Sequence, residues 1–337
     1  MIATTNPVMP DMKRLVLIVS MLLVVAVCAT SAAAQTYTDA VTAFNEGDEL
    51  ARGGKHKEAI AAFERVINIS NALGAEGAEI KKKAEDYIPQ LHFAHAVGLA
   101  REGKLLDAAT AFEATITVSR RYNNANLTQR AQQGLLQAYY SAGNQALQAK
   151  NFERAIELYD KAIGVQNTFA QAYYNKGLAL RNLGRGDEAL EQFDRAIQLA
   201  QASRNNQILE AATGAARNHL LLKSAESKSA KKYPETVALL NQAIAYKEAD
   251  AELHYRLAEV YNVMALFDNA IESANKAMEY ETGGPVDRAR IWFELGYAYK
   301  FKVNVSAACE AYKNASFGDF RAGAEHAMQH ELKCPKN

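Results

Sequence analysis

Two pairs of histidines have a spacing that would bring their rings to one face of a helix. His326 and His330 are four residues apart, and His92 and His95 are three apart. Either pair could supply two metal ligands, but a zinc site needs three or four, and no third ligand is predictable from the sequence. The HAMQH segment that starts at His326 also lacks the glutamate of a metalloprotease helix. We therefore interpret both pairs as solvated surface histidines and expect no metal site, no cofactor and no catalytic residue.

The cysteines offer a different chemistry. The chain contains 3 of them, and Cys28 lies in an N-terminal segment that we expect to be removed. Cys309 and Cys334 would remain, and an even number of cysteines in an exported chain is typical of a disulfide. A bridge requires their Cα atoms to come within about 7 Å. The alternative is two buried free thiols.

The N-terminal segment has the pattern of a secretory signal peptide. Lys13 and Arg14 precede an apolar run over 15–29, and small residues follow up to Ala34. Cleavage after Ala34 would make Gln35 the first residue of an exported protein, periplasmic or extracellular, and the Ala-Ala-Ala-Gln ending favours a bacterial periplasm. The alternative is an uncleaved membrane anchor, although the apolar run is shorter than the ~20 residues that span a bilayer.

Composition excludes several classes of protein. Lys plus Arg and Asp plus Glu both number 38, so no overall charge would attract nucleic acid or an anionic membrane. A hydrophobic content of 49% argues against a disordered chain. Alanine, leucine, glutamine, glutamate and lysine dominate, while glycine and proline are sparse, which predicts an all-α protein.

An internal repeat organises the chain. Two adjacent segments, beginning at Leu135 and Phe169, align with an offset of 34 residues, so that Gly143 falls on Gly177. A fixed period of this length is typical of a helical-repeat solenoid. In the same register, seven units begin near Ala40, Pro89, Leu136, Ala170, Arg217, Ala251 and Ala289.

Small residues recur at two positions of the units. The eighth position holds Gly47, Ala96, Gly143, Gly177, Ser224, Ala258 and Gly296, and the twentieth holds Ala59, Ala108, Ala155, Ala189, Thr236, Ala270 and Ala308. Such residues allow two antiparallel helices to cross closely. The twenty-fourth position is mostly bulky and should fill the space between units: Phe63, Phe112, Tyr159, Phe193, Leu240, Ala274 and Tyr312.

This pattern resembles the tetratricopeptide repeat (TPR) family over about residues 40–320. Only Trp292 supplies the family's tryptophan at the fourth position, and the family's proline at the thirty-second position is absent throughout. The resemblance implies a right-handed α-solenoid of about seven helix-turn-helix units over 35–316. The segment 317–337 then forms a C-terminal capping helix and tail, and 1–34 is the signal peptide.

Some units are longer than the family's period. The extra segments, 74–88, 123–135 and 204–216, should lengthen helices, shared between the end of one helix and the start of the next. In the cap, Phe320, Ala324, Ala327, Met328 and Leu332 form one apolar stripe that would cover the last unit. A Cys309–Cys334 bridge would fasten this cap.

The resemblance also implies where a partner would bind, since in this family the first helix of each unit lines a concave groove. The fifth position, which faces that groove, is aromatic in six units of seven: Phe44, Phe93, Tyr140, Tyr174, Tyr255 and Phe293, with Leu221 in the fifth unit. Polar groove residues beside them include Asn144, Asn175, Arg181 and Arg256. Rings and amides suit an extended peptide or a helix. The alternative is that these rings pack against the neighbouring first helix and serve stability, as Tyr139 and Tyr173 are expected to do in the core.

The function that follows is a non-enzymatic scaffold of the cell envelope, which binds a protein or peptide in its groove and binds no nucleic acid. One alternative is a membrane-tethered subunit of an envelope assembly, attached through the uncleaved signal. Another is an enzyme or a metal-binding protein, but seven units, a signal and a cap leave no room for a catalytic domain. The partner's identity and the oligomeric state are not encoded in these patterns.

Overall fold

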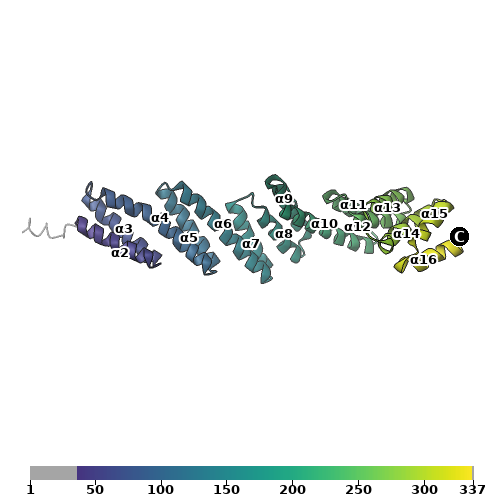
Figure 1. The fold of residues 1–337 in the computed structure, drawn as a ribbon, viewed down its shortest axis with the longest axis horizontal. Coiled ribbons are helices and arrows are strands. Elements are labelled where there is room, and N and C mark those ends of the chain that lie inside the picture. The colour runs from purple at the N-terminus through teal and green to yellow at the C-terminus, as the bar shows by residue number, and fades with distance from the viewer. Residues whose placement is uncertain (1–35, 336–337) are drawn as a thin grey trace, which may run out of the picture. The chain divides into compact units, whose positions relative to one another are not determined.

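The computed structural model describes residues 36–335, and these residues form helices joined by short turns, with no strand among them (Figure 1). The signal peptide predicted over 1–34 lies outside the described residues. The chain divides into two compact units, Met1–Ala138 and Tyr139–Asn337, which are described separately.

The first unit is a series of antiparallel helices in which each helix packs on the next along the chain. It comprises α2 (Tyr37–Arg52), α3 (His56–Leu73), α4 (Ala78–Arg101), α5 (Leu105–Arg121) and the beginning of α6 (Ala125–Gln148). Thr36 begins the series with a capping box, because its hydroxyl accepts from the Asp39 amide while the Asp39 carboxylate accepts from the Thr36 amide.

The second unit continues the same alternation. After the end of α6 come α7 (Phe152–Val165), α8 (Ala170–Asn182), α9 (Gly186–Ser203), α10 (Asn206–Ser229), α11 (Tyr233–Tyr246), α12 (Ala251–Val263), α13 (Phe267–Tyr280), α14 (Pro285–Phe301) and α15 (Val305–Ala315). Residues 36–335 therefore contain the seven helix pairs that the repeat predicts, from α2/α3 to α14/α15. We call the first helix of each pair helix A and the second helix B.

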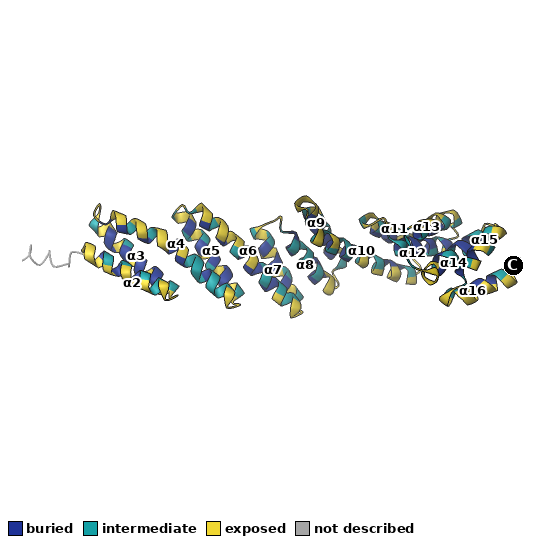
Figure 2. Ribbon diagram, in the orientation of Figure 1, coloured by how far each residue is buried: buried dark blue, intermediate teal, exposed yellow. Residues whose placement is uncertain are grey.

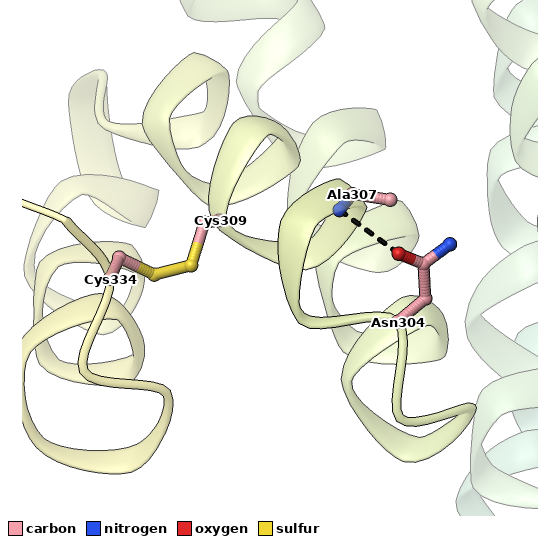
Figure 3. The surroundings of a disulfide bond; sticks show 4 residues. All are labelled: Asn304, Ala307, Cys309 and Cys334. Carbon is pink, nitrogen blue, oxygen red and sulfur yellow. Dashed lines mark hydrogen bonds between the residues drawn. A yellow bond between two sulfur atoms is a disulfide. The ribbon is translucent and has the colours of Figure 1, made fainter.

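A left-handed residue reverses the chain between helix A and helix B in every described pair. It occupies the fifteenth position of the repeat: Gly54, Gly103, Lys150, Gly184, Lys231, Ala265 and Val303. Glycine adopts positive φ without a Cβ clash, whereas a β-branched residue such as Val303, at φ 59°, is strained there. The next helix is then started by an asparagine in two pairs; Asn304, for example, accepts a hydrogen bond from the Ala307 amide at 3.2 Å (Figure 3).

Each helix has a buried face (Figure 2). Buried alanines and glycines lie where the two helices of a pair are in contact. The small eighth position has a further cause that the sequence did not show: a ring at the twenty-fourth position lies over it. A Cβ built on Gly143 would approach Tyr159 Cε1 to 2.7 Å, and one on Gly177 would approach Phe193 Cε1 to 2.6 Å. A residue with a side chain at either position would therefore collide with the ring, and glycine avoids this collision.

The helices are long where the three inserted segments predict it, but the added length is divided unequally between helix B and the following helix A. Helices α4, α6 and α10 each have 24 residues, against 13 in α8 and α12. The B helices before them, α3, α5 and α9, have 18, 17 and 18 residues, against 14 in α7, α11 and α13. Most of each inserted segment thus precedes a helix A.

The C-terminal cap is one short helical segment made of η1 (Gly318–Phe320), α16 (Arg321–His326) and η2 (Ala327–Glu331), the last a π-helical turn. Its buried Ala324 and Ala327 pack on a cluster that includes Tyr312 and Ala315 of α15. A disulfide joins Cys309 of α15 to Cys334 just beyond the cap, with a Cα–Cα distance of 5.8 Å (Figure 3). The cap is therefore fastened covalently to the last helix B.

Candidate protein-binding surface

The aromatic residues at the fifth position contact a ring in their own helix pair. In five pairs, the fifth-position ring packs on the twenty-fourth-position ring of helix B, and we call this contact a ring pair. The centroid distances are 5.1 Å for Phe44–Phe63, 5.8 Å for Phe93–Phe112, 6.0 Å for Tyr140–Tyr159, 6.1 Å for Tyr174–Phe193 and 5.5 Å for Phe293–Tyr312.

The two members of a ring pair differ in exposure. The helix-B rings are buried, with Tyr159 and Phe193 at 0%, whereas the helix-A rings are half-buried in all five pairs. The sequence left open exposure in a groove or packing on the neighbouring helix A. The helix-A rings combine partial exposure with contact to their own helix B, and Phe44 also contacts Tyr87 of the next helix A. Tyr140 also packs on Phe169 with the ring centroids 5.0 Å apart, and Phe293 packs on Phe320 at 5.5 Å, so only part of each ring is accessible.

Tyr140 belongs to a hydrogen-bonded network that joins α6 to α8. The Asn175 amide donates from Nδ2 to Asn144 Oδ1 at 2.8 Å and to the Tyr140 hydroxyl at 3.1 Å, and the Tyr159 hydroxyl donates to Asn144 Oδ1 at 2.8 Å. Burial raises the pKa of the Tyr159 phenol, so it remains a donor at neutral pH. The network thus brings three of the predicted groove residues together. Asn144 Nδ2 and Asn175 Oδ1 take no part in its hydrogen bonds.

Tyr173 lies differently from its equivalent Tyr139, although the sequence assigned both to the core. Tyr139 is 8% exposed, but Tyr173 is half-buried, and its hydroxyl donates to the Asn167 carbonyl at 3.2 Å. The Arg195 guanidinium lies 6.0 Å from the Tyr173 ring. The Tyr173 hydroxyl has a backbone hydrogen-bond partner at the surface, which stabilises the ring in this half-buried position.

Tyr255 is more enclosed than a groove residue should be. It is 8% exposed, and the guanidinium groups of Arg290 and Arg256 lie 4.9 and 5.6 Å from its ring centroid. Burial raises its pKa to about 12. Little of the Tyr255 ring is therefore accessible, and the exposed group there is Arg256, which pairs with Glu252 at 2.7 Å.

A half-buried carboxyl group that the sequence patterns did not single out, Glu294, lies on α14. Asn262 of α12 donates from Nδ2 to Glu294 Oε2 at 2.7 Å and to the Glu294 carbonyl at 3.0 Å. Burial, with a smaller contribution from Glu259, raises the pKa of Glu294 to about 7 despite the Asn262 hydrogen bond. Its position, the sixth of its unit, also faces the expected groove and is the signal that could have found it.

Arg181, another predicted groove residue, is exposed and borders a polar cavity of about 400 Å³. His219 and Lys223 also line this cavity, and Lys223 pairs with Asp187 at 2.6 Å. Burial lowers the pKa of His219, so its imidazole is neutral at pH 7. The cavity has mixed polarity and carries both signs of charge.

In the first unit, Phe93 borders a polar cavity of about 380 Å³ that Asn124 and Asn126 also line. The Arg130 guanidinium lies 4.5 Å from the Phe93 ring centroid, a cation–π contact. Arg130 comes from one of the inserted helical segments, which sequence reasoning treated only as added length. Phe44 lies beside Tyr87 of another inserted segment, with ring centroids 5.7 Å apart.

Two structural findings concern chemistry and membranes. Within residues 36–335, no three His, Cys, Asp or Glu side chains are grouped so that they could hold a metal ion. No helix in that part of the chain combines the length and the apolarity needed to cross a bilayer. The rings of His326 and His330 lie 4.9 Å apart on the exposed face of the cap.

The fold and this surface define an all-α helical-repeat protein, and comparison with known proteins agrees with that class. Residues 36–73 and 140–205 match family models described as tetratricopeptide repeat. No curated protein sequence matches the chain.

Several solved structures of helical-repeat proteins are similar to this one. MamA from Desulfovibrio magneticus RS-1 is 21% identical, with 53% of this chain and 92% of that chain covered and a TM-score of 0.33. YrrB, described as a TPR protein with an unusual peptide-binding site, is 20% identical, with 57% and 91% covered and a TM-score of 0.34. The TPR domain of P58(IPK) is 13% identical, with 89% and 100% covered and a TM-score of 0.31.

Proposed function

We propose that this chain is a non-enzymatic scaffold that binds another polypeptide through the helix-A surface of its second unit. A tetratricopeptide-type repeat supports protein–protein interaction in general, because stacked helix pairs present a long row of side chains from successive A helices. The observation that carries the proposal here is the network of Tyr140, Asn144 and Asn175, which combines a half-exposed ring with amide groups on two successive A helices.

The chemistry of that surface suits a polypeptide backbone. A side-chain amide offers both a donor and an acceptor, as a peptide unit does, and an adjacent tyrosine ring offers apolar area at a small cost in side-chain entropy. Because Asn144 and Asn175 hold each other, they are ordered before a ligand arrives, which reduces the entropy lost on binding. Arg181 on the same helix as Asn175 adds an exposed cation.

We place this scaffold outside the cytoplasm, on the pattern of Lys13, Arg14 and the apolar run up to Ala34. The alternative, a membrane-tethered assembly subunit, requires that this segment stay attached. Mass spectrometry of the N-terminus of the native protein separates the two: a first residue at Gln35 excludes the tethered form, and an intact apolar run excludes the released form.

The binding surface is tested by cross-linking the native protein to its partners in its own envelope fraction. Asn175→Ala and Arg181→Glu should each weaken partner recovery by about tenfold, the size expected when one or two contacts at an interface are lost. Arg195→Glu, the same charge reversal on an exposed site of α9, is the matched control and should retain the partner. Unchanged recovery with both surface variants would place the interface elsewhere.

A further inference from the structure

The fifth helix pair, α10/α11, lacks the ring pair that five others possess. Its fifth position is Leu221 and its twenty-fourth is Leu240, with Ser224 and Thr236 at the two positions that are glycine or alanine in the other pairs. A leucine side chain lacks the length and the flat faces of an aromatic ring, so two leucines leave part of the ring-pair volume unfilled.

A cavity of about 510 Å³ lies where the rings are missing, lined by residues of α10, α11 and α12. Leu221 and Leu222 form its accessible apolar wall, while Leu240 and Val260 lie beneath it, each 1% exposed. Lys228 and Arg256 also border the cavity. Several of its lining residues occupy positions that face the expected groove. Leu222 is 65% exposed, which places a large apolar side chain in water beside the cavity.

The three hydroxyl groups in the cavity wall are already satisfied. Ser229 Oγ donates to the Ala225 carbonyl at 2.9 Å. Ser224 Oγ donates to the Leu221 carbonyl at 2.7 Å, and Thr236 Oγ1 donates to the Lys232 carbonyl at 3.0 Å. They therefore demand no hydrogen bond from an occupant, and the interior presents methyl and methylene groups. The size is within the range of about 300–1,000 Å³ that is usual for ligand sites.

The charges that border the cavity are both positive. Lys228 pairs with Glu259 at 2.6 Å, and Arg256 pairs with Glu252 at 2.7 Å, and these contacts hold the two cations in place. Among the described residues that line the cavity, none is acidic. The Arg256 side chain is 46% exposed, so one face of its guanidinium is free to stack on a ring.

We propose that this cavity receives one aromatic side chain of a partner polypeptide whose neighbouring residues are acidic. The aromatic ring would supply the volume that the ring pairs fill elsewhere, with Leu222 and the Arg256 guanidinium in contact with it. The flanking carboxylates would face Lys228 and Arg256. This inference rests on the proposed function, because it assigns a specific side-chain site within the same helix-A surface.

The test uses a short fluorescein-labelled peptide in which one phenylalanine is flanked on both sides by aspartate, and its binding to the purified chain is followed by fluorescence anisotropy. A peptide with alanine in place of phenylalanine should bind about tenfold more weakly, as expected for the loss of a buried ring. A peptide with lysine in place of aspartate should also bind more weakly, and the difference should shrink at high salt.

Variants of the chain locate the site. Leu221→Phe with Leu240→Phe restores a ring pair and should abolish the preference for phenylalanine. If that variant does not fold, Ala225→Trp covers the cavity from an exposed position on α10 and should have the same effect. Ala230→Trp, at the exposed end of α10 and outside the cavity lining, is the control and should keep the preference.

Each outcome has a separate meaning. Equal binding of the phenylalanine and alanine peptides overturns the inference even if the cross-linked partner of the proposed function is found. A preference for phenylalanine that survives in both Leu221→Phe/Leu240→Phe and Ala225→Trp also overturns it. Tighter binding of the lysine peptide overturns the acidic part. A phenylalanine preference lost in the filled variant supports the site even when no cross-linked partner is recovered, which would count only against the proposed function.

Discussion

Two neighbouring helix pairs, α8/α9 and α10/α11, are built on one plan and differ in what fills them. In α8/α9, Tyr174 and Phe193 form a ring pair over Gly177, and Phe193 is fully buried. In α10/α11, the equivalent residues are Leu221 and Leu240, and a cavity of about 510 Å³ lies beside them. The difference shows that a helix pair forms without a ring pair, and that leucines can replace the two rings.

The fifth pair compensates with aliphatic packing. Leu220, Leu239, Leu240, Leu253 and Val260 belong to one buried cluster that joins α10, α11 and α12. That cluster lies beside the cavity and keeps Leu240 buried, at 1% exposed, so the pair has a core although it lacks the two rings. The core of the fifth pair is thus aliphatic, whereas the core of α8/α9 contains a ring pair.

Replacing the twenty-fourth-position residue with alanine should give the largest difference in stability between the two pairs. Phe193→Ala should lower the free energy of unfolding by about 3–5 kcal/mol, because it leaves a large cavity in a filled pair. Leu240→Ala should cost less, about 2–3 kcal/mol, because a buried leucine has fewer packed atoms than a buried phenylalanine. Urea unfolding measures both values. Equal losses would show that the two pairs are filled to the same extent.

Removal of the disulfide should expose the last ring pair. The cap covers Phe293, whose ring lies 5.5 Å from Phe320, and the bridge closes a sequence separation of 25. Cys309→Ser with Cys334→Ser should lower the stability of the cap by about 3 kcal/mol, since a bridge over a loop of this size limits the unfolded chain. Hydrogen exchange over 318–332 should accelerate, with exchange in α8 as the internal reference. Unchanged exchange over the cap would mean that packing alone holds it.

The pH dependence of stability should distinguish two hydrogen-bonded contacts, each of which joins successive A helices. Asn144–Asn175 cannot titrate, but Asn262–Glu294 contains a carboxyl group whose pKa burial raises to about 7 from 4.5. The unfolded chain releases that proton at a lower pH than the folded chain does. Stability should therefore fall by about 2–3 kcal/mol as pH rises from 4.5 to 7, and stay level above that window as far as this group is concerned.

Glu294→Gln is the control for this pH effect, because the amide keeps an oxygen for Asn262 and cannot ionise. The difference in unfolding free energy between the variant and the parent should widen across the same window. A parallel pH dependence in both proteins would show that Glu294 is not the group responsible.

The smallest expected effect concerns the turns that close the pairs. The turn of α8/α9 contains Gly184 at φ 77°, and the turn of α14/α15 contains Val303 at φ 59°. Val303→Gly should therefore raise the free energy of unfolding by about 1 kcal/mol, because the strain of a β-branched residue is removed. Gly184→Val should lower it by a similar amount. A loss of stability in Val303→Gly would mean that the exposed valine makes contacts that outweigh its strain.

The helix pairs were accessible from the sequence because their determinants are local and repeat. Small residues at the eighth and twentieth positions, a bulky residue at the twenty-fourth and a fixed period were enough to predict seven pairs, longer helices at the three inserted segments and a cap. Each of these signals acts within one pair or between adjacent pairs.

The candidate surface was accessible only in part. The position that faces the groove placed Tyr140, Asn144 and Asn175 on one side of the A helices, and the structure brings them within hydrogen-bond distance. The burial of Tyr255, the exposure of Tyr173 and the pKa of Glu294 depended on which partners lie across the next helix. Those partners are set by side-chain packing between pairs, and a pattern within one pair does not contain them.

By itself, then, the sequence determined the all-α repeat, the number of pairs and the row of aromatic positions, because helix period and residue size are properties of the chain alone. Tertiary structure decided what each ring does. A ring over a glycine fills a pair, a ring under two guanidinium groups is enclosed, and two leucines in the same places leave a cavity. These outcomes differ because close packing depends on all the atoms that meet at one point, and those atoms come from three helices at once.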